Sequence, residues 1–290
     1  MICSPFRVLV LELQDAASSD DPLTNLSRVK EMIASAVEGG AGFVLTPEVT
    51  NIISQDRQHQ SDVLHLEADD PVLAGLRDAA ATHGIWLAIG SLAIKTGDDD
   101  GRFANRSFVI APDGSIRARY DKIHMFDVQV SETETFRESA GFRPGEEAVT
   151  CETPFGTLGL TVCYDVRFPY LHRALCQAGA TILLAPAAFS PVTGAAHWEP
   201  LLRARAIENG AYVLAAAQTG NHAVHSGKPR QTYGHSMVIS PWGEVLVDAG
   251  VDEGIVFIDL DPDQVAQARA RVPSLLHDRV FRGPDGQEHK

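Results

Sequence analysis

Short apolar runs alternate with amphipathic stretches along this chain. The apolar runs have the length and flanking turn residues of strands, whereas the amphipathic stretches repeat their apolar residues with the period of a helix. Over residues 24–38, for example, Val29, Ile33 and Val37 lie on one side of the helix that this period predicts. Such alternation predicts an α/β fold, in which helices cover a central sheet.

The same pattern predicts where most elements lie. Strands are expected over residues 6–13, 42–45, 85–89, 106–111, 115–120, 148–151, 157–162, 181–185, 211–217, 235–239, 244–247 and 255–258. Helices are expected over residues 24–38, 71–83, 167–178, 198–208 and 261–271, with Pro200 in the first turn of its helix, where a proline is tolerated. Residues 121–145 lose the apolar period, and a polar segment of this length in a compact chain is often functional.

Composition and charge narrow the class of protein. The chain has 290 residues, 44% hydrophobic and 21% charged, and without a repeat or linker we expect one domain over residues 1–290 with a tail from about residue 272. The chain has 24 Lys and Arg residues and 38 Asp and Glu residues, which gives a net charge of −14. Because it also has no basic run, we do not expect nucleic acid or an anionic membrane as a partner. No apolar run reaches the roughly 20 residues that cross a bilayer, and residues 1–7 lack the features of a signal peptide, so a cytoplasmic protein is expected.

Three predicted strand ends carry residues that could perform chemistry. Glu48, Lys122 and Cys163 each follow an apolar run, and strand ends in an α/β fold gather side chains into a common cleft. Alone, each has an ordinary interpretation: a carboxylate at a helix start, a solvated surface charge and a small core residue. Together they supply the base, the cation and the nucleophile that covalent cysteine catalysis requires. The other cysteines, Cys3, Cys151 and Cys176, lie beside no matching base, and the four show no spacing typical of a zinc site or a disulfide framework.

The motifs around these residues resemble the nitrilase, or carbon-nitrogen hydrolase, superfamily. Its Glu-Lys-Cys triad is matched in order by residues 47–48 (Pro-Glu), 120–124 (Tyr-Asp-Lys-Ile-His) and 163–168 (Cys-Tyr-Asp-Val-Arg-Phe). The resemblance covers essentially the whole chain. It implies a four-layer αββα sandwich and a hydrolase of linear amides that needs no metal or organic cofactor.

Further motifs favour one branch of this superfamily. The tripeptide Cys-Tyr-Asp, which begins at the expected nucleophile Cys163, is similar to the one found in amidases. Nitrilases proper tend to have Cys-Trp-Glu at this place. Residues 187–190 (Ala-Ala-Phe-Ser) and 193–199 (Thr-Gly-Ala-Ala-His-Trp-Glu) resemble the deaminated glutathione amidases and their sister branch, the omega-amidases. Thr46, before the Pro-Glu pair, and residues 49–51, after it, depart from the common pattern.

The resemblance also implies roles for single residues. Glu48 would be the general base, Cys163 the nucleophile, and Lys122 with the backbone N–H of Tyr164 the oxyanion donors. Glu138, which follows Lys122 by 16 residues, matches a further active-site carboxylate of some branches, although a salt bridge to a nearby arginine is the alternative.

The implied substrate is a small carboxylate-bearing linear amide, of the deaminated glutathione or dicarboxylic acid monoamide type. Arg167 and Phe189 are the candidate substrate contacts, and an ion pair with Asp165 is the structural alternative for Arg167. Three activities remain open: an amidase, a nitrilase or N-carbamoyl amino acid hydrolase with the same triad, and a non-catalytic scaffold. The family's habit of dimerising, together with Leu276 and Phe281 in the polar tail, leads us to expect a homodimer or higher homo-oligomer.

Overall fold

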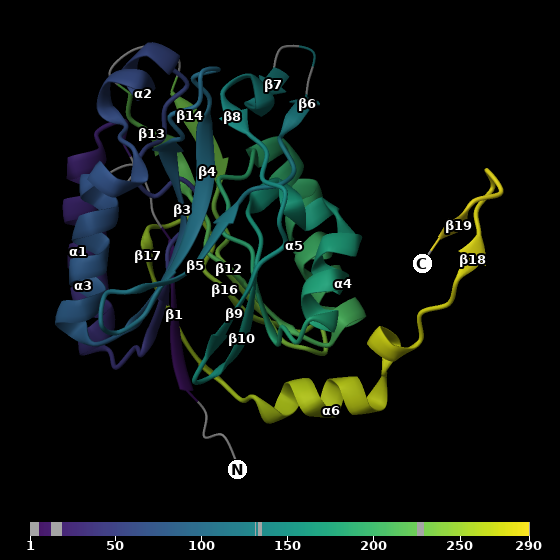
Figure 1. The fold of residues 1–290 in the computed structure, drawn as a ribbon. Coiled ribbons are helices and arrows are strands. Elements are labelled where there is room, and N and C mark those ends of the chain that lie inside the picture. The colour runs from purple at the N-terminus through teal and green to yellow at the C-terminus, as the bar shows by residue number, and fades with distance from the viewer. Residues whose placement is uncertain (1–5, 13–18, 131, 133–134, 225–228, 290) are drawn as a thin grey trace.

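Two β-sheets pack face to face, and helices cover the outer face of each (Figure 1). The computed structural model describes residues 6–12, 19–130, 132, 135–224 and 229–289. The layers follow the order helix, sheet, sheet, helix, which confirms the predicted αββα sandwich.

The first sheet has the strand order β17-β1-β2-β3-β4-β5, with β8 beside β4. Strands β1, β2 and β3 are parallel, and the flanking pairs β1–β17, β3–β4 and β4–β5 are antiparallel. Helices α1 (Pro22–Glu38) and α3 (Pro71–His83) cover its outer face. Its strands are β1 (Phe6–Glu12), β2 (Phe43–Leu45), β3 (Trp86–Lys95), β4 (Phe103–Ile110), β5 (Ile116–Asp121), β8 (Phe142–Arg143) and β17 (Gly254–Leu260).

The second sheet has the order β16-β15-β12-β11-β10-β9. Strands β10, β11 and β12 are parallel, again with antiparallel strands on both sides. Helices α4 (Pro169–Gln177) and α5 (Pro191–Asn209) pack on its outer face. Its strands are β9 (Thr150–Thr153), β10 (Gly156–Leu160), β11 (Ile182–Leu184), β12 (Tyr212–Ala215), β15 (Met237–Ile239) and β16 (Val245–Asp248).

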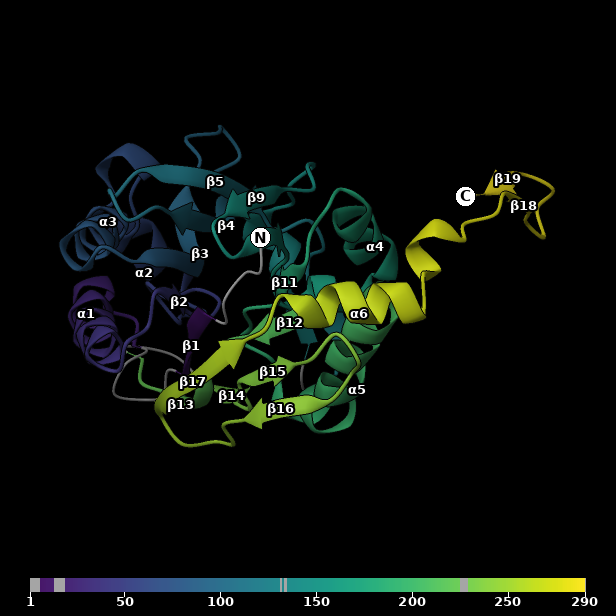
Figure 2. The same cartoon turned by 90° about the horizontal axis from the view of Figure 1, so that it is seen from below.

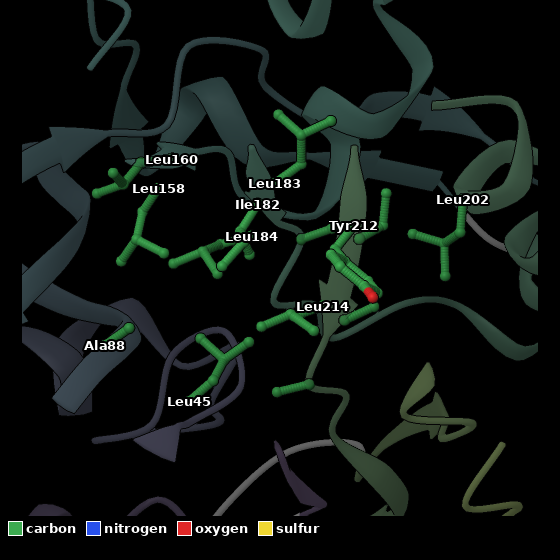
Figure 3. Packing of buried hydrophobic residues seen from close by; sticks show 14 of the residues in the cluster. Leu45, Ala88, Leu158, Leu160, Ile182, Leu183, Leu184, Leu202, Tyr212 and Leu214 are labelled. Carbon is green, nitrogen blue, oxygen red and sulfur yellow. The ribbon is translucent and has the colours of Figure 1, made fainter. Parts of the chain in front are cut away.

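The principal core lies between the sheets. Because side chains alternate across a strand, Phe43 and Leu45 of β2 face the second sheet, whereas Val44 packs against the helices of the first layer. Figure 3 shows Leu45 and Ala88 of the first sheet opposite Leu214 and its neighbours in the second. This packing fixes how the strand ends of the two sheets face each other.

Several predicted boundaries are wrong; strand β4, for example, begins at Phe103 and not at residue 106. Helix α5 begins at Pro191, well before residue 198, so that Pro200 lies inside the helix and not in its first turn. The helix predicted over residues 167–178 begins at Pro169, because residues 163–167 form the 3-10 turn η3. Strand β3 continues to Lys95, whereas the predicted strand ends at residue 89.

Smaller elements complete the chain. The polar segment 121–145 contains a short hairpin and a 3-10 turn, and a second hairpin, β13–β14, was not predicted. The C-terminal segment projects away from the body after α6 (Figure 2). Among the described helices, none has both the length and the apolar surface to cross a bilayer. These elements are α2 (Arg57–Val63), β6 (Asp127–Gln129), β7 (Thr135–Arg137), β13 (Thr219–His222), β14 (Arg230–Tyr233), α6 (Asp263–Arg271), β18 (Phe281–Arg282), β19 (Glu288–His289), and the 3-10 turns η1 (Glu67–Asp69), η2 (Glu138–Ala140), η3 (Cys163–Arg167) and η4 (Ser274–Leu276).

Candidate active site

The structure brings the three strand-end residues to one cavity. Glu48 lies beyond the end of β2, Lys122 follows β5, and Cys163 begins η3 after β10. All three line a cavity of about 320 Å³. The predicted base and cation therefore follow strands of the first sheet, and the predicted nucleophile follows a strand of the second.

Lys122 lies between two carboxylates. Its Nζ is 2.9 Å from Oε1 of Glu48 and 2.8 Å from Oε2 of Glu138. The backbone N–H of Phe126 donates to the same Glu138 oxygen at 2.7 Å. Glu138 thus pairs with Lys122, while Arg143, a nearby arginine, pairs with Asp98.

Glu48 is held from both sheets. Its Oε2 accepts a hydrogen bond of 2.8 Å from the backbone N–H of Ala188, which lies beyond β11. The side-chain amide of Gln218 donates to the Glu48 carbonyl at 2.9 Å. Since each carboxylate oxygen has its own donor, the carboxylate is fixed in orientation before a substrate arrives.

Asn105, on β4, contacts every charged member of this cluster, and the sequence analysis missed it. Its Nδ2 donates to Glu48 at 2.9 Å and to Glu138 at 3.3 Å, and its backbone carbonyl accepts from the Lys122 N–H at 3.0 Å. Its Oδ1 is buried and has no hydrogen-bond partner among the described residues. The available signal was a polar asparagine beside an apolar strand, where asparagine is disfavoured.

Cys163, the predicted nucleophile, lies in a strained turn. Cys163 has a φ of 50°, which a non-glycine residue rarely adopts, and its N–H donates to the Pro186 carbonyl at 2.8 Å. The buried Asp165 carboxylate holds the turn by accepting from the Tyr120 hydroxyl at 2.7 Å and from the Val162 N–H at 2.8 Å. The surrounding contacts therefore maintain a backbone conformation that places Cys163 at the cavity.

The turn that carries Glu48 is equally constrained. Val49 has a φ of 47°, and its N–H donates to the Ser91 hydroxyl at 2.8 Å. Gly90 approaches so closely that a Cβ there would lie 2.1 Å from the Thr46 carbonyl oxygen. Only glycine fits at this position, because the opposing atom is rigid backbone.

Burial and charge together set the protonation states. Burial and the negative charge of Glu48 raise the pKa of the Cys163 thiol well above its usual value. Burial alone would raise the pKa of Glu48, but the charges of Lys122 and Arg230 outweigh it and lower that pKa. Burial likewise opposes the charge of Lys122, yet Glu138 and Glu48 raise its pKa well above the usual range. These shifts favour the carboxylate form of Glu48 and the thiol form of Cys163.

The three remaining predicted residues lie in different surroundings. The Tyr164 ring packs against Phe126, with ring centroids 5.1 Å apart. Phe189 lines the cavity. The guanidinium carbon of Arg167 lies 5.6 Å from the Phe189 ring and 5.7 Å from the Tyr164 ring, outside the residues that line the cavity.

Other arginines, which the sequence analysis did not single out, do line the cavity. Arg230 on β14 donates from Nη2 to the Ala188 carbonyl at 2.7 Å. Arg57 donates to the Gly141 carbonyl at 2.7 Å, and its guanidinium carbon lies 4.4 Å from the centre of the Phe103 ring. No sequence signal distinguished them from surface arginines, because their neighbours in the chain are polar.

The other cysteines lie apart from this chemistry. Cys151 and Cys176 are buried free thiols that do not line the cavity, and Cys3 lies outside the described residues. Burial raises the pKa of Cys176 to about 12. In the described ranges, no three His, Cys, Asp or Glu side chains are grouped so that they could hold a metal ion.

The geometry agrees with the sequence comparisons. The carbon-nitrogen hydrolase family model matches residues 14–270, and the chain belongs to this family. It is therefore a hydrolase of carbon–nitrogen bonds other than peptide bonds, and the predicted resemblance is confirmed.

Two curated relatives illustrate the branch. The chain is 39% identical over 274 residues to the deaminated glutathione amidase of Dictyostelium discoideum, covering 92% of this chain and 93% of the relative. It is 35% identical over 268 residues to the human omega-amidase NIT2, with 92% and 93% covered. Both branches singled out by the motifs are thus among its relatives.

Solved structures agree with the fold. The C. elegans NitFhit protein has a TM-score of 0.87 at 38% identity, covering 96% of this chain, and this chain spans 66% of that protein. An amidase mutant from Nesterenkonia sp. AN1, with acrylamide added at its active-site cysteine, has a TM-score of 0.73 at 28% identity, covering 92% of this chain and 98% of that one.

Proposed function

We propose that the protein is a cysteine amidase that hydrolyses a small carboxylate-bearing linear amide to an acid and ammonia through a thioester. The observation that carries the proposal is the meeting of Glu48, Lys122 and Cys163 in one cavity, with the Lys122 ammonium buried 2.9 Å from the Glu48 carboxylate. The three side chains supply the base, the cation and the nucleophile of covalent cysteine catalysis, and the directions of the Glu48 and Cys163 pKa shifts agree with a carboxylate base beside a thiol.

The first half of the reaction forms the thioester. Glu48 takes the proton from the Cys163 thiol, and the sulfur forms a bond to the amide carbonyl carbon. The ammonium of Lys122 and the backbone N–H of Tyr164 stabilise the resulting oxyanion. The carbon–nitrogen bond then breaks as the nitrogen takes the proton from Glu48 and leaves as ammonia.

The second half releases the acid. Glu48 removes a proton from a water molecule, whose oxygen attacks the thioester carbon. The carbon–sulfur bond breaks, and the Cys163 thiolate regains the proton from Glu48. In both halves Glu138 and Asn105 hold Lys122 and Glu48 in place, so neither base nor cation must reorganise between the steps.

The alternative functions are another hydrolase with the same triad and a scaffold protein without catalysis. A nitrilase or an N-carbamoyl amino acid hydrolase would use the same triad, and Tyr164-Asp165 after the nucleophile favours the amidase. Burying a lysine between two carboxylates costs free energy of desolvation. A scaffold protein would have no physical need for such an arrangement, whereas catalysis requires it.

An ammonia-release screen tests the proposal. The substrates are monoamides of dicarboxylic acids, deaminated glutathione, N-carbamoyl amino acids and nitriles. We expect release from the carboxylate-bearing amides, together with a covalent acyl adduct on Cys163 in the mass spectrum of quenched enzyme. Activity on nitriles or carbamoyl compounds alone would contradict the amidase proposal, and inactivity on all four classes would favour the scaffold.

The C-terminal segment supports a second proposal, that the protein forms at least a homodimer. Leu276 is 81% exposed, and Val280 and Phe281 are also exposed. This segment is anchored to the body at its start, where Arg173 of α4 donates to the Ser274 carbonyl at 2.7 Å, and then projects outward (Figure 2). Apolar side chains on a projecting arm would be covered by a second subunit.

A further inference from the structure

The cavity contains a second polar site that the proposed mechanism does not use. Arg230, on β14, and Ser190, which immediately precedes α5, line the same cavity as Glu48 and Cys163. We call this pair the Arg230–Ser190 site.

The Ser190 hydroxyl has an unused hydrogen-bonding capacity. The residue is 6% exposed, and its Oγ has no hydrogen-bond partner among the described residues. It occupies the N-cap position of α5, where a serine commonly accepts from the first turn, yet it makes no such bond. A buried hydroxyl without a partner is costly, so a ligand that bonds to it recovers free energy.

Arg230 also retains donors. Within the part of the chain that the structure describes, its guanidinium makes one hydrogen bond, from Nη2 to the Ala188 carbonyl. A guanidinium has five N–H donors. The rest can serve a ligand in the cavity, whereas Lys122, which Glu48 and Glu138 hold in place, is assigned to the oxyanion in the proposed mechanism.

Backbone contacts place the two side chains on one wall. The Tyr233 N–H of β14 donates to the Phe189 carbonyl at 2.9 Å, and Arg230 bonds to Ala188 in the same segment. The Ala188 N–H in turn donates to Glu48. The wall that carries Arg230 and Ser190 is therefore tied directly to the catalytic base.

We infer that Arg230 and Ser190 bind the carboxylate of the substrate, an inference that rests on the proposed amidase function. A guanidinium offers two parallel N–H groups to a carboxylate, and a hydroxyl adds a third donor. In a protein of net charge −14, an anionic substrate needs such a local cation. Arg167, the arginine expected from the sequence, lies outside the lining of the cavity.

The test compares two amides of similar size, succinamate, which carries a carboxylate, and butyramide, which is neutral. The readout is the kcat/KM for succinamate divided by the kcat/KM for butyramide. Arg230→Gln should reduce this ratio at least about tenfold, because hydrogen bonds to charged groups are strong. Ser190→Ala should reduce the ratio a few-fold, and Arg230→Lys should fall between wild type and Arg230→Gln. The ratio is the readout because Arg230 also supports Glu48, which acts on both substrates.

Arg167→Gln is the matched comparison. If it reduces the ratio and Arg230→Gln does not, the inference is wrong while the amidase function stands. Equal losses on both substrates in Arg230→Gln would also overturn the inference.

A binding measurement separates this inference from the proposed function. Calorimetry measures the affinity of succinate for a Cys163→Ala variant. This affinity should fall at least about tenfold in the double variant Cys163→Ala, Arg230→Gln. This result is expected whichever amides the enzyme hydrolyses. Unchanged succinate affinity would overturn the inference, whereas inactivity of the wild type on every amide would overturn only the amidase function.

Discussion

Replacement of Asn105 should change the protonation of Glu48, the proposed general base. Asn105→Leu removes the donor to Glu48, and Asn105→Asp also adds a negative charge beside it. A hydrogen bond to a charged group contributes about 1.5–3 kcal/mol, and about 1.4 kcal/mol corresponds to one pH unit. Because the lost donor favours the charged form, the pKa of Glu48 should rise by about one to two pH units in Asn105→Leu and by more in Asn105→Asp.

The assay is the pH dependence of kcat/KM for ammonia release. Its acidic limb reports the ionisation of the base in the free enzyme, so the limb should move to higher pH in the order wild type, Asn105→Leu, Asn105→Asp. The alkylation rate of Cys163 by iodoacetamide, followed by mass spectrometry, gives the same test without a substrate.

Asn209 provides the matched control. It is also buried, its Nδ2 donates to the Arg205 carbonyl at 2.8 Å, and its Oδ1 likewise has no partner among the described residues. It lies outside the catalytic cavity. Asn209→Asp should therefore destabilise the fold without moving the acidic limb. An unmoved limb in Asn105→Asp, with activity lowered equally at every pH, would refute the reasoning.

Three further predictions concern the nucleophile, the stability and the assembly. Cys163→Ala should abolish ammonia release with an unchanged circular dichroism spectrum, whereas Cys151→Ala and Cys176→Ala should remain active; near-normal release by Cys163→Ala would exclude covalent catalysis through this residue. Burial lowers the pKa of His172 to about 4 from 6.5, so the unfolded chain binds its proton first and the free energy of unfolding should fall by about 3 kcal/mol as pH drops from 6.5 to 4. Urea unfolding of His172→Gln should lack this part of the pH dependence. The full chain should sediment as at least a dimer, and removal of residues 273–290 should weaken the association; a monomeric full chain would contradict the assembly proposal.

Local patterns predicted the elements that position the triad. The apolar runs before Glu48 and Cys163 end where the strands of a sheet end, and the structure places both residues at that edge. This success has a physical reason, because a buried strand must be apolar and its end is where polar side chains reach the surface of the core.

Local patterns do not predict contacts between segments that are distant in the sequence. Asn105 meets Glu48 across 57 positions, and Ala188 meets it across 140, with no periodicity that links them. Arg230 and Ser190 were missed for the same reason. Which loops meet across two sheets is set by sheet packing, and a single sequence does not contain that information in readable form.

The start of α5 was missed because tertiary packing overrides local preference. Residues 191–197 lack a helical apolar period, and Pro200 suggested a first turn. In the structure, Gly194 lies so close to Tyr233 that a Cβ would be 2.3 Å from the ring. The helix begins early because this contact and the burial of Trp198 stabilise it.

The division of the proposed catalytic residues between the two sheets has a mechanical consequence. Glu48 and Lys122 follow strands of the first sheet and Cys163 follows a strand of the second, so a slide of one sheet over the other would strain the bonds from Ala188 and Gln218 to Glu48 and shift the carboxylate relative to the thiol. Residues deep between the sheets, such as Leu45 and Leu160, resist that slide although they do not line the cavity. We therefore expect the loss of a methyl group there to disturb the alignment of Glu48 and Cys163 as well as the packing of the core. Substitutions in the interior between the sheets should therefore change the rate of turnover as well as the stability of the protein.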